Sequence, residues 1–207
     1  MADFKAVVFD MDGVLVDARE WHFEALNFAL SYFGASISYD EHLARFDGLP
    51  TRVKLDMLSQ DGRIPRRLHG LIESVKQRET QRLISVMCQP TFEHQALLQA
   101  LKADGKLVGL ASNSIEDTIR SMMSRCQLID YFDLIAHNKS VERPKPHPDI
   151  YRYAFNALGV GPEEAIVVED NPNGIAAARA SGARVMEVDS PSDLTRATFF
   201  DFVQGVT

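Results

Sequence analysis

Short apolar runs alternate with longer stretches of helical periodicity along most of this chain. The first run, residues 6–9, reads Ala-Val-Val-Phe and is followed by acidic residues. Runs of similar character recur at residues 107–111, 134–136, 165–168 and 185–188. Consecutive apolar residues between polar ones are typical of a strand that is buried on both faces. The alternation predicts an α/β fold with a doubly wound parallel sheet.

A long segment without a strand pattern interrupts the alternation after the first apolar run. Helices are expected in it at residues 18–33, 38–46, 51–60 and 65–87. Ser38, with Glu41 three positions later, is a capping signature for the second of these helices. We therefore expect a small α-helical cap domain at residues 18–88, inserted into a core domain formed by residues 1–17 and 89–207.

The later strands are separated by segments with helical spacing of their apolar residues. These segments are residues 91–102, 114–125, 148–158 and 174–180. Ser114, with Asp117 three positions later, is expected to cap the second of them. Right-handed crossovers through these helices would cover both faces of the sheet.

The composition is that of an ordinary globular protein, since 45% of the 207 residues are hydrophobic and 25% are charged. The formal net charge of −7 argues against nucleic acid or an anionic membrane as a partner. We see neither an apolar stretch of membrane-spanning length nor a signal-peptide pattern. Cys88 and Cys126 show no disulfide framework, so we expect buried thiols and a cytoplasmic location.

Acidic residues follow the first predicted strand directly. Asp10 and Asp12 are separated by one residue, and Gly13 allows the backbone to turn sharply behind them. Ligands in open α/β sheets gather beyond the carboxyl ends of the strands. Two carboxylates this close repel each other, and a bound divalent cation would stabilise the pair. The tripeptide alone is weak evidence, because such sequences also occur in acidic turns without chemistry.

Two other strand ends and one loop supply complementary groups. Ser112 and Asn113 follow the second predicted strand and offer a hydroxyl and an amide to phosphate oxygens. Glu169 and Asp170 follow the fourth strand, and anionic oxygen ligands of this kind suit Mg²⁺. Lys145 lies in the stiff sequence Arg-Pro-Lys-Pro-His-Pro, where it offers a fixed positive charge to a phosphate.

In this order and spacing, the four motifs resemble those of the haloacid dehalogenase superfamily. They are Asp10-Met-Asp12-Gly-Val, Ser112-Asn113, Lys145 in its proline-rich loop, and Glu169-Asp170-Asn-Pro-Asn-Gly. The helical insertion looks like the small cap of the β-phosphoglucomutase and phosphoglycolate phosphatase branch. The resemblance implies a Rossmann-like core and a phosphoric monoester hydrolase, and it covers nearly the whole chain.

The resemblance also implies a role for each core residue. Asp10 would be the nucleophile that forms an aspartyl-phosphate, and Asp12 would be the general acid and then the general base. Ser112 and Asn113 would bind the transferring phosphoryl group. Lys145 would neutralise charge on the nucleophile and on the phosphoryl oxygens.

A bound Mg²⁺ ion follows from the same resemblance. Its ligands would be the Asp10 carboxylate, the Asp12 backbone carbonyl and Asp170, with Glu169 in contact directly or through water. The expected reaction is Mg²⁺-dependent hydrolysis of a small phosphorylated metabolite, such as a sugar or polyol phosphate. We expect a monomer or weak dimer with neither a nucleic-acid nor a membrane partner.

Substrate contacts are expected from the cap, with an ordinary structural alternative for each. His22 would lie near the active site and help to position Asp12, or it would partly cover its own helix face. Arg52 would bind a second anionic group of the substrate, or it would be a solvent-exposed residue at a helix start. Lys76 would face the substrate, although a solvated basic face shared with Arg78 and Arg82 is favoured.

Other activities of the same superfamily are less favoured by these motifs. A phosphoglucomutase-type mutase would also pass through an aspartyl-phosphate, and the motifs do not separate it from a phosphatase. A non-catalytic binding protein would have no need for Asp10, Asp12 and Lys145 together. A dehalogenase would have no use for Asp12 or for the acidic pair Glu169 and Asp170.

Overall fold

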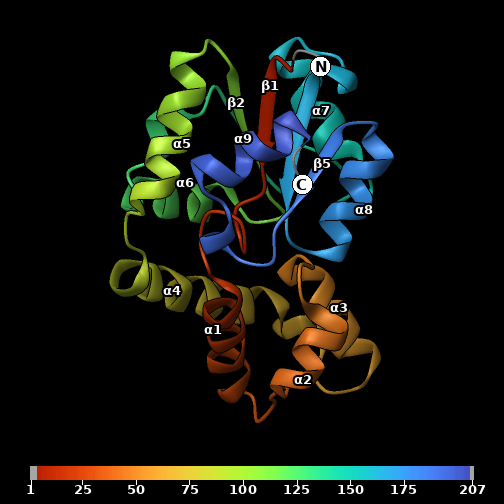
Figure 1. The fold of residues 1–207 in the computed structure, drawn as a ribbon. Helices are drawn as coiled ribbons and strands as arrows, with labels where there is room; N and C mark the ends of the chain where they lie inside the picture. The colour runs from red at the N-terminus through yellow and green to blue at the C-terminus, as the bar shows by residue number, and fades with distance from the viewer. Residues whose placement is uncertain (1–3, 206–207) are drawn as a thin grey trace. The chain divides into compact units, whose positions relative to one another are not determined.

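The computed structural model describes residues 4–205. Their strands form one five-stranded parallel sheet in the order β3-β2-β1-β4-β5 (Figure 1). The strands are β1 Ala6–Phe9, β2 Leu107–Ala111, β3 Leu134–Ala136, β4 Ala165–Glu169 and β5 Arg184–Glu187. The predicted α/β class is confirmed, and each predicted strand is present with its ends displaced by no more than one residue.

The central strand is β1, and all of its residues are buried. Ala6 pairs with Leu107 of β2 on one side and with Ala165 of β4 on the other. The pairing with β4 continues past the strand, because the Asp10 amide donates a hydrogen bond of 3.0 Å to the Val168 carbonyl. Asp10 therefore emerges between the carboxyl ends of β2 and β4, at the edge where ligands bind in such sheets.

Helices cover both faces of the sheet. They are α5 Phe92–Ala103, α6 Glu116–Arg125, α7 Asp149–Leu158, α8 Pro172–Ser181 and α9 Arg196–Gln204. Residues of α7 and α8 form a hydrophobic cluster with alternate strand residues, among them Ala6, Val8 and Val167. Figure 1 shows α9 in front of the sheet and α7 behind it. The sheet is therefore doubly wound, as predicted.

The prediction that Ser114 caps α6 is wrong. The residue at the helix start is Ile115, and within the described part of the chain no side chain caps this helix. The Ser114 hydroxyl instead donates a hydrogen bond of 3.1 Å to Asp12 Oδ2. Ser114 lies one position before the N-cap residue Ile115. Its side chain instead links the loop after β2 to the loop after β1.

The chain divides into two compact units, one of which is Ala18–Cys88. Its helices are α1 Arg19–Ser31, α2 Tyr39–Glu41, a π-helical turn His42–Phe46, α3 Thr51–Gln60, a 3₁₀ turn Arg66–Leu68 and α4 His69–Met87. They pack around buried side chains that include Leu26, Phe46 and Ile72. The Ser38 hydroxyl accepts a hydrogen bond from the Glu41 amide, so the predicted capping serine is confirmed.

The structure of the described residues also bears on the predictions about membrane spans and cysteines. None of the helices formed by residues 4–205 is both long enough and apolar enough to cross a membrane. Cys88 and Cys126 are both buried and are not joined in a disulfide, as predicted.

Candidate active site

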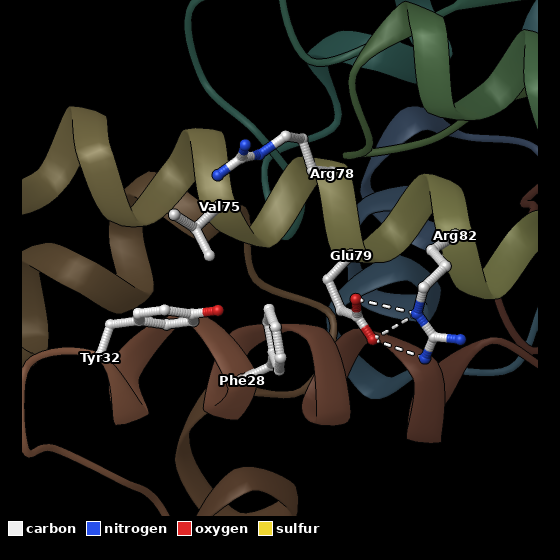
Figure 2. A pocket seen from close by; sticks show the side chains of 6 residues that line it. All are labelled: Phe28, Tyr32, Val75, Arg78, Glu79 and Arg82. Atoms are coloured by element: carbon white, nitrogen blue, oxygen red, sulfur yellow. Dashed lines mark hydrogen bonds and ion pairs between the residues drawn. The ribbon is translucent and has the colours of Figure 1, made fainter.

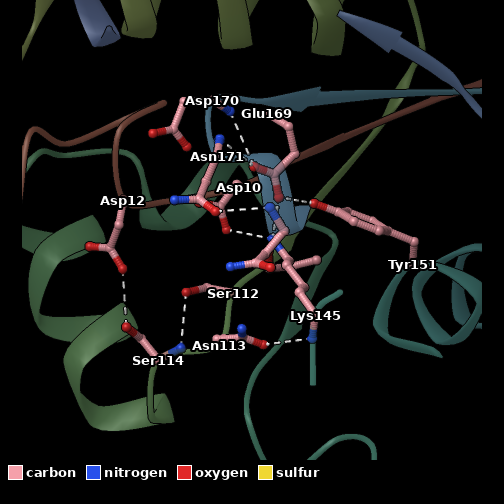
Figure 3. A network of polar contacts seen from close by, with 12 residues as sticks. Asp10, Asp12, Ser112, Asn113, Ser114, Lys145, Tyr151, Glu169, Asp170 and Asn171 are labelled. Atoms are coloured by element: carbon pink, nitrogen blue, oxygen red, sulfur yellow. Dashed lines mark hydrogen bonds and ion pairs between the residues drawn. The ribbon is translucent and has the colours of Figure 1, made fainter. Parts of the chain in front are cut away.

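A buried ion pair between Asp10 and Lys145 lies at the carboxyl end of β1 (Figure 3). Lys145 Nζ donates a hydrogen bond of 2.7 Å to Asp10 Oδ1. It also donates to the Ala111 carbonyl at 2.9 Å and to Glu169 Oε1 at 2.6 Å. An ammonium group has three hydrogens, and these acceptors take one each. Because Lys145 is only 4% exposed, its charge is fixed between the two carboxylates.

The Glu169 carboxylate accepts hydrogen bonds at both of its oxygens. Oε1 accepts from Lys145 and also from the Tyr151 hydroxyl. Oε2 accepts from the backbone amides of Asp170 and Asn171, at 3.1 and 3.4 Å. Tyr151 was not predicted from the sequence as a site residue. The signal for it was its place on the buried face of a predicted helix, where a phenol needs an acceptor.

Two glycines allow the acidic side chains to approach the backbone closely. Gly13 has a φ of +88°, and a Cβ atom placed on it would lie 2.0 Å from Asp170 Oδ2. A Cβ atom on Gly174 would lie 1.9 Å from Glu169 Oε1. A side chain at either position would displace a carboxylate, so the glycines of the first and last motifs make space for the acidic pair.

Three carboxylates have the spacing of a metal site. Among the described residues, Asp10, Glu169 and Asp170 each offer one oxygen, and these oxygens lie within 4.8 Å of one another. The oxygen ligands of an octahedral Mg²⁺ ion lie about 3 Å apart when they are adjacent and about 4 Å apart when they are opposite. The residues present therefore fit such an ion. The Asp12 carboxylate is not a member of this group, and only its backbone carbonyl was expected as a ligand.

Polar residues at the end of β2 complete the site (Figure 3). Ser112 Oγ accepts a hydrogen bond of 3.0 Å from the Ser114 amide, and Asn113 Oδ1 accepts one of 3.2 Å from the Lys145 amide. Ser114 Oγ in turn donates to Asp12 Oδ2. The structure therefore brings together the residues of the core unit that the motifs singled out.

Burial dominates the electrostatics of the Asp10 carboxyl group. It raises the pKa of the Asp10 carboxyl well above its usual range, while the Lys145 ammonium acts in the opposite direction. The negative charges of Glu169 and Asp12 raise this pKa further. Burial also works to lower the pKa of Lys145, but attraction to Asp10 and Glu169 outweighs it and the pKa is raised. The Lys145 ammonium therefore acts against burial and favours the ionised form of Asp10.

Within the helical unit, two of the three predicted substrate-binding residues lie together. Lys76 Nζ on α4 is 3.3 Å from His22 Nδ1 on α1. Arg52 lies on α3 and is exposed. Their predicted role in substrate binding stays a prediction.

A hollow on the same unit contains none of the predicted residues (Figure 2). Its lining residues are Phe28, Tyr32, Val75, Arg78, Glu79 and Arg82. Arg82 forms an ion pair of 2.7 Å with Glu79, one helical turn earlier on α4. Arg78 and Arg82 are both exposed, and the alternative of a solvated basic face on this helix stays a prediction.

Comparison with known proteins identifies the family. A model of the haloacid dehalogenase-like hydrolases matches residues 7–188. The chain belongs to the haloacid dehalogenase-like hydrolases. This match covers all four motifs and the helical unit, and it confirms the resemblance seen in the sequence.

Relatives in this family place the chain in the predicted branch. It is 30% identical to a phosphorylated carbohydrates phosphatase of Thermotoga maritima, covering 86% of this chain and 82% of the relative. It is 31% identical to hexitol phosphatase B of Escherichia coli, covering 90% and 84%. The fold is that of a β-phosphoglucomutase from Clostridium difficile, with a TM-score of 0.84, 23% identity and coverage of 98% and 96%.

Proposed function

We propose that this hydrolase is a Mg²⁺-dependent phosphatase of a small phosphorylated sugar or polyol, acting through an aspartyl-phosphate. The observation that carries the proposal is the buried Asp10 carboxylate at the end of β1, with Lys145 Nζ 2.7 Å from one oxygen. The relatives named as phosphatases of carbohydrate and hexitol phosphates support both the reaction and the substrate class.

In the proposed mechanism Asp10 attacks phosphorus and the leaving oxygen takes a proton from Asp12. Lys145 remains beside Asp10 and offsets the negative charge that gathers there and on the phosphoryl oxygens. Ser112 and Asn113 are the expected donors to those oxygens. Asp12 then accepts a proton from the water that hydrolyses the aspartyl-phosphate. The hydrogen bond from Ser114 to Asp12 limits the orientations of this acid and base.

The proposed Mg²⁺ ligands are the Asp10 carboxylate, the Asp12 carbonyl and Asp170. A bound Mg²⁺ ion supplies positive charge to the phosphoryl oxygens. Glu169 already accepts hydrogen bonds from Lys145, Tyr151 and two backbone amides, which favours contact through water over direct ligation. Its carboxylate therefore acts mainly on Lys145 in this proposal.

Contacts to the rest of the substrate are assigned to His22, Arg52 and Lys76 of the helical unit. Lys76 Nζ and His22 Nδ1 are 3.3 Å apart, so these two side chains would contact the substrate together. Arg52, which is exposed, would bind a second anionic group of the substrate. A monomer or weak dimer remains the expected assembly.

Phosphate release from a panel of several dozen phosphorylated metabolites tests the proposal, with and without Mg²⁺. We expect Asp10→Asn to lower kcat by about a thousandfold or more, because the amide cannot form the acyl-phosphate. Asp104→Asn is the matched control. This exposed residue precedes the amino-terminal end of β2, whereas Asp10 lies at the carboxyl ends of the strands. Conversion of one hexose phosphate into another without phosphate release would contradict a phosphatase and indicate a mutase.

A further inference from the structure

We propose that the Tyr151 hydroxyl is a positioning group that acts through Glu169 to keep the Lys145 ammonium on Asp10. The inference rests on the proposed function, since it concerns the charge beside the nucleophile. Tyr151 belongs to α7 and has none of its surface exposed. Its hydroxyl and the Lys145 ammonium donate to the same oxygen, Glu169 Oε1 (Figure 3).

Lys145 is shared between two carboxylates at nearly equal distances. Its Nζ lies 2.7 Å from Asp10 Oδ1 and 2.6 Å from Glu169 Oε1. The position of the ammonium therefore depends on how strongly each oxygen attracts it. The Tyr151 hydroxyl offsets part of the negative charge on Glu169 Oε1, because it is a second donor to that atom.

Loss of this hydroxyl would strengthen the attraction of Glu169 for Lys145. The ammonium would then shift toward Glu169 and away from Asp10, and the Glu169 carboxylate would have one fewer donor to fix its orientation. A displacement of a fraction of an ångström is enough to weaken charge stabilisation in a water-poor site. The expected result is a slower chemical step with little change in substrate binding.

Packing alone does not account for the hydroxyl. The Tyr151 ring lies against the Lys145 ammonium, with Nζ 4.8 Å from the ring centroid. A phenylalanine ring would fill the same space and keep this contact. The difference between the two side chains at this position is therefore the donor to Glu169.

Tyr151→Phe tests the inference, with Tyr153→Phe on the same helix as the matched control. Tyr153 is 40% exposed and stands outside the network. For Tyr151→Phe we expect kcat for the best substrate to fall about tenfold with KM changed less than about twofold. The inhibition constant of orthovanadate, which mimics the transition state, should rise by a similar factor. Tyr153→Phe should match the wild type in all three quantities.

A second comparison separates action through Glu169 from a general loss of structure. In a Glu169→Gln background, Tyr151→Phe should cause less than about a twofold further loss of kcat, because residues acting through one group are not additive. A full tenfold further loss would overturn the inference. Circular dichroism and Tm show that each variant is folded at the assay temperature.

Failure of the inference and failure of the proposed function give different results. An active wild-type enzyme whose kcat and orthovanadate inhibition are unchanged by Tyr151→Phe overturns the inference alone. A wild-type enzyme that releases phosphate from none of the metabolites overturns the proposed function, and the inference with it.

Discussion

Gly13 and Gly174 lie against the two carboxylates of the acidic pair. Both positions have less than 2.5 Å between a hypothetical Cβ atom and a carboxylate oxygen, which no real side chain tolerates. Gly13 also has a positive φ, which L-residues rarely adopt. The identity of these two residues is therefore determined by where Asp170 and Glu169 must be placed.

Gly13→Ala should lower both stability and Mg²⁺ affinity. The left-handed backbone costs about 1 to 2 kcal/mol for a residue with a Cβ atom. This atom would also push the Asp170 carboxylate away from those of Asp10 and Glu169. Gly105→Ala is the control, because Gly105 has a φ of +68° but no described atom lies within 4 Å of its added Cβ. Chemical denaturation and Mg²⁺ titration measure the two effects. Equal Mg²⁺ affinity in both variants would contradict the proposed role of Asp170.

Site residues could be predicted from the sequence where their immediate sequence neighbours form a recognisable motif. Asp10 and Asp170 directly follow apolar strands, and Lys145 lies between prolines, so their motifs are visible without the fold. Tyr151 was missed because its contact with Glu169 depends on how α7 packs on the sheet. Ser114 was misassigned because a serine near a helix start can cap it or can bond to another strand end, and only the fold decides between them.

At the scale of elements, Asp133 joins α5 to β2. Its carboxylate accepts hydrogen bonds from Lys102 Nζ on α5, at 2.6 and 2.7 Å, and from the Val108 amide in β2, at 2.8 Å. Burial opposes ionisation of Asp133, but the bonds from Lys102 and Val108 outweigh it and lower the pKa of this carboxyl. The charged form is therefore bound more favourably in the folded protein than in the unfolded chain.

Asp133→Asn should destabilise the protein at neutral pH by about 1 to 2 kcal/mol, the lower part of the range for hydrogen bonds to a charged group, because solvent partly screens the pair with Lys102. An unfolded aspartate titrates near pH 4, so the contribution is complete above that pH and is lost as pH falls through the lower folded pKa. Urea unfolding between pH 7 and pH 3 should show the wild type and the variant converging in acid. A constant difference across this range would contradict the assignment, and Asp104→Asn should follow the wild type throughout.

The strands could be predicted from the sequence more accurately than the last helix. Buried strands have continuous apolar runs, so their ends were predicted to within one residue. The helix α9 was not predicted, because Phe199, Phe200 and Phe202 lie almost side by side in the sequence instead of at helical spacing. Of these, Phe199 is buried and packs edge-on against Phe4, a contact that only the fold reveals.

For the molecule as a whole, the proposed Mg²⁺ site at Asp10, Glu169 and Asp170 would link metal binding to stability. Asp10, Glu169 and Asp170 repel one another in a chain whose net charge is already −7. A cation that binds only the folded state stabilises it by about 2.7 kcal/mol at one hundred times its Kd. For a chain of this length we expect saturating Mg²⁺ to raise Tm by about 5 to 10 °C, and EDTA to reverse the increase.

Asp170→Asn should lose most of this increase in Tm, because it removes one of the proposed charged ligands. Thermal unfolding followed by circular dichroism, with Asp104→Asn as control, measures it. The same Mg²⁺-dependent rise in Asp170→Asn and in the wild type would place the ion elsewhere.

The central position of β1 has a consequence for biosynthesis. This strand is translated before both of its neighbours, because β2 and β4 begin at Leu107 and Ala165. Pairing between strands so distant in sequence makes folding slow. During translation, the apolar residues of β1 are therefore unpaired until β2 and β4 have been synthesised. Asp10 is therefore synthesised well before the strands that flank it, and it can take its place between them only after both have been translated.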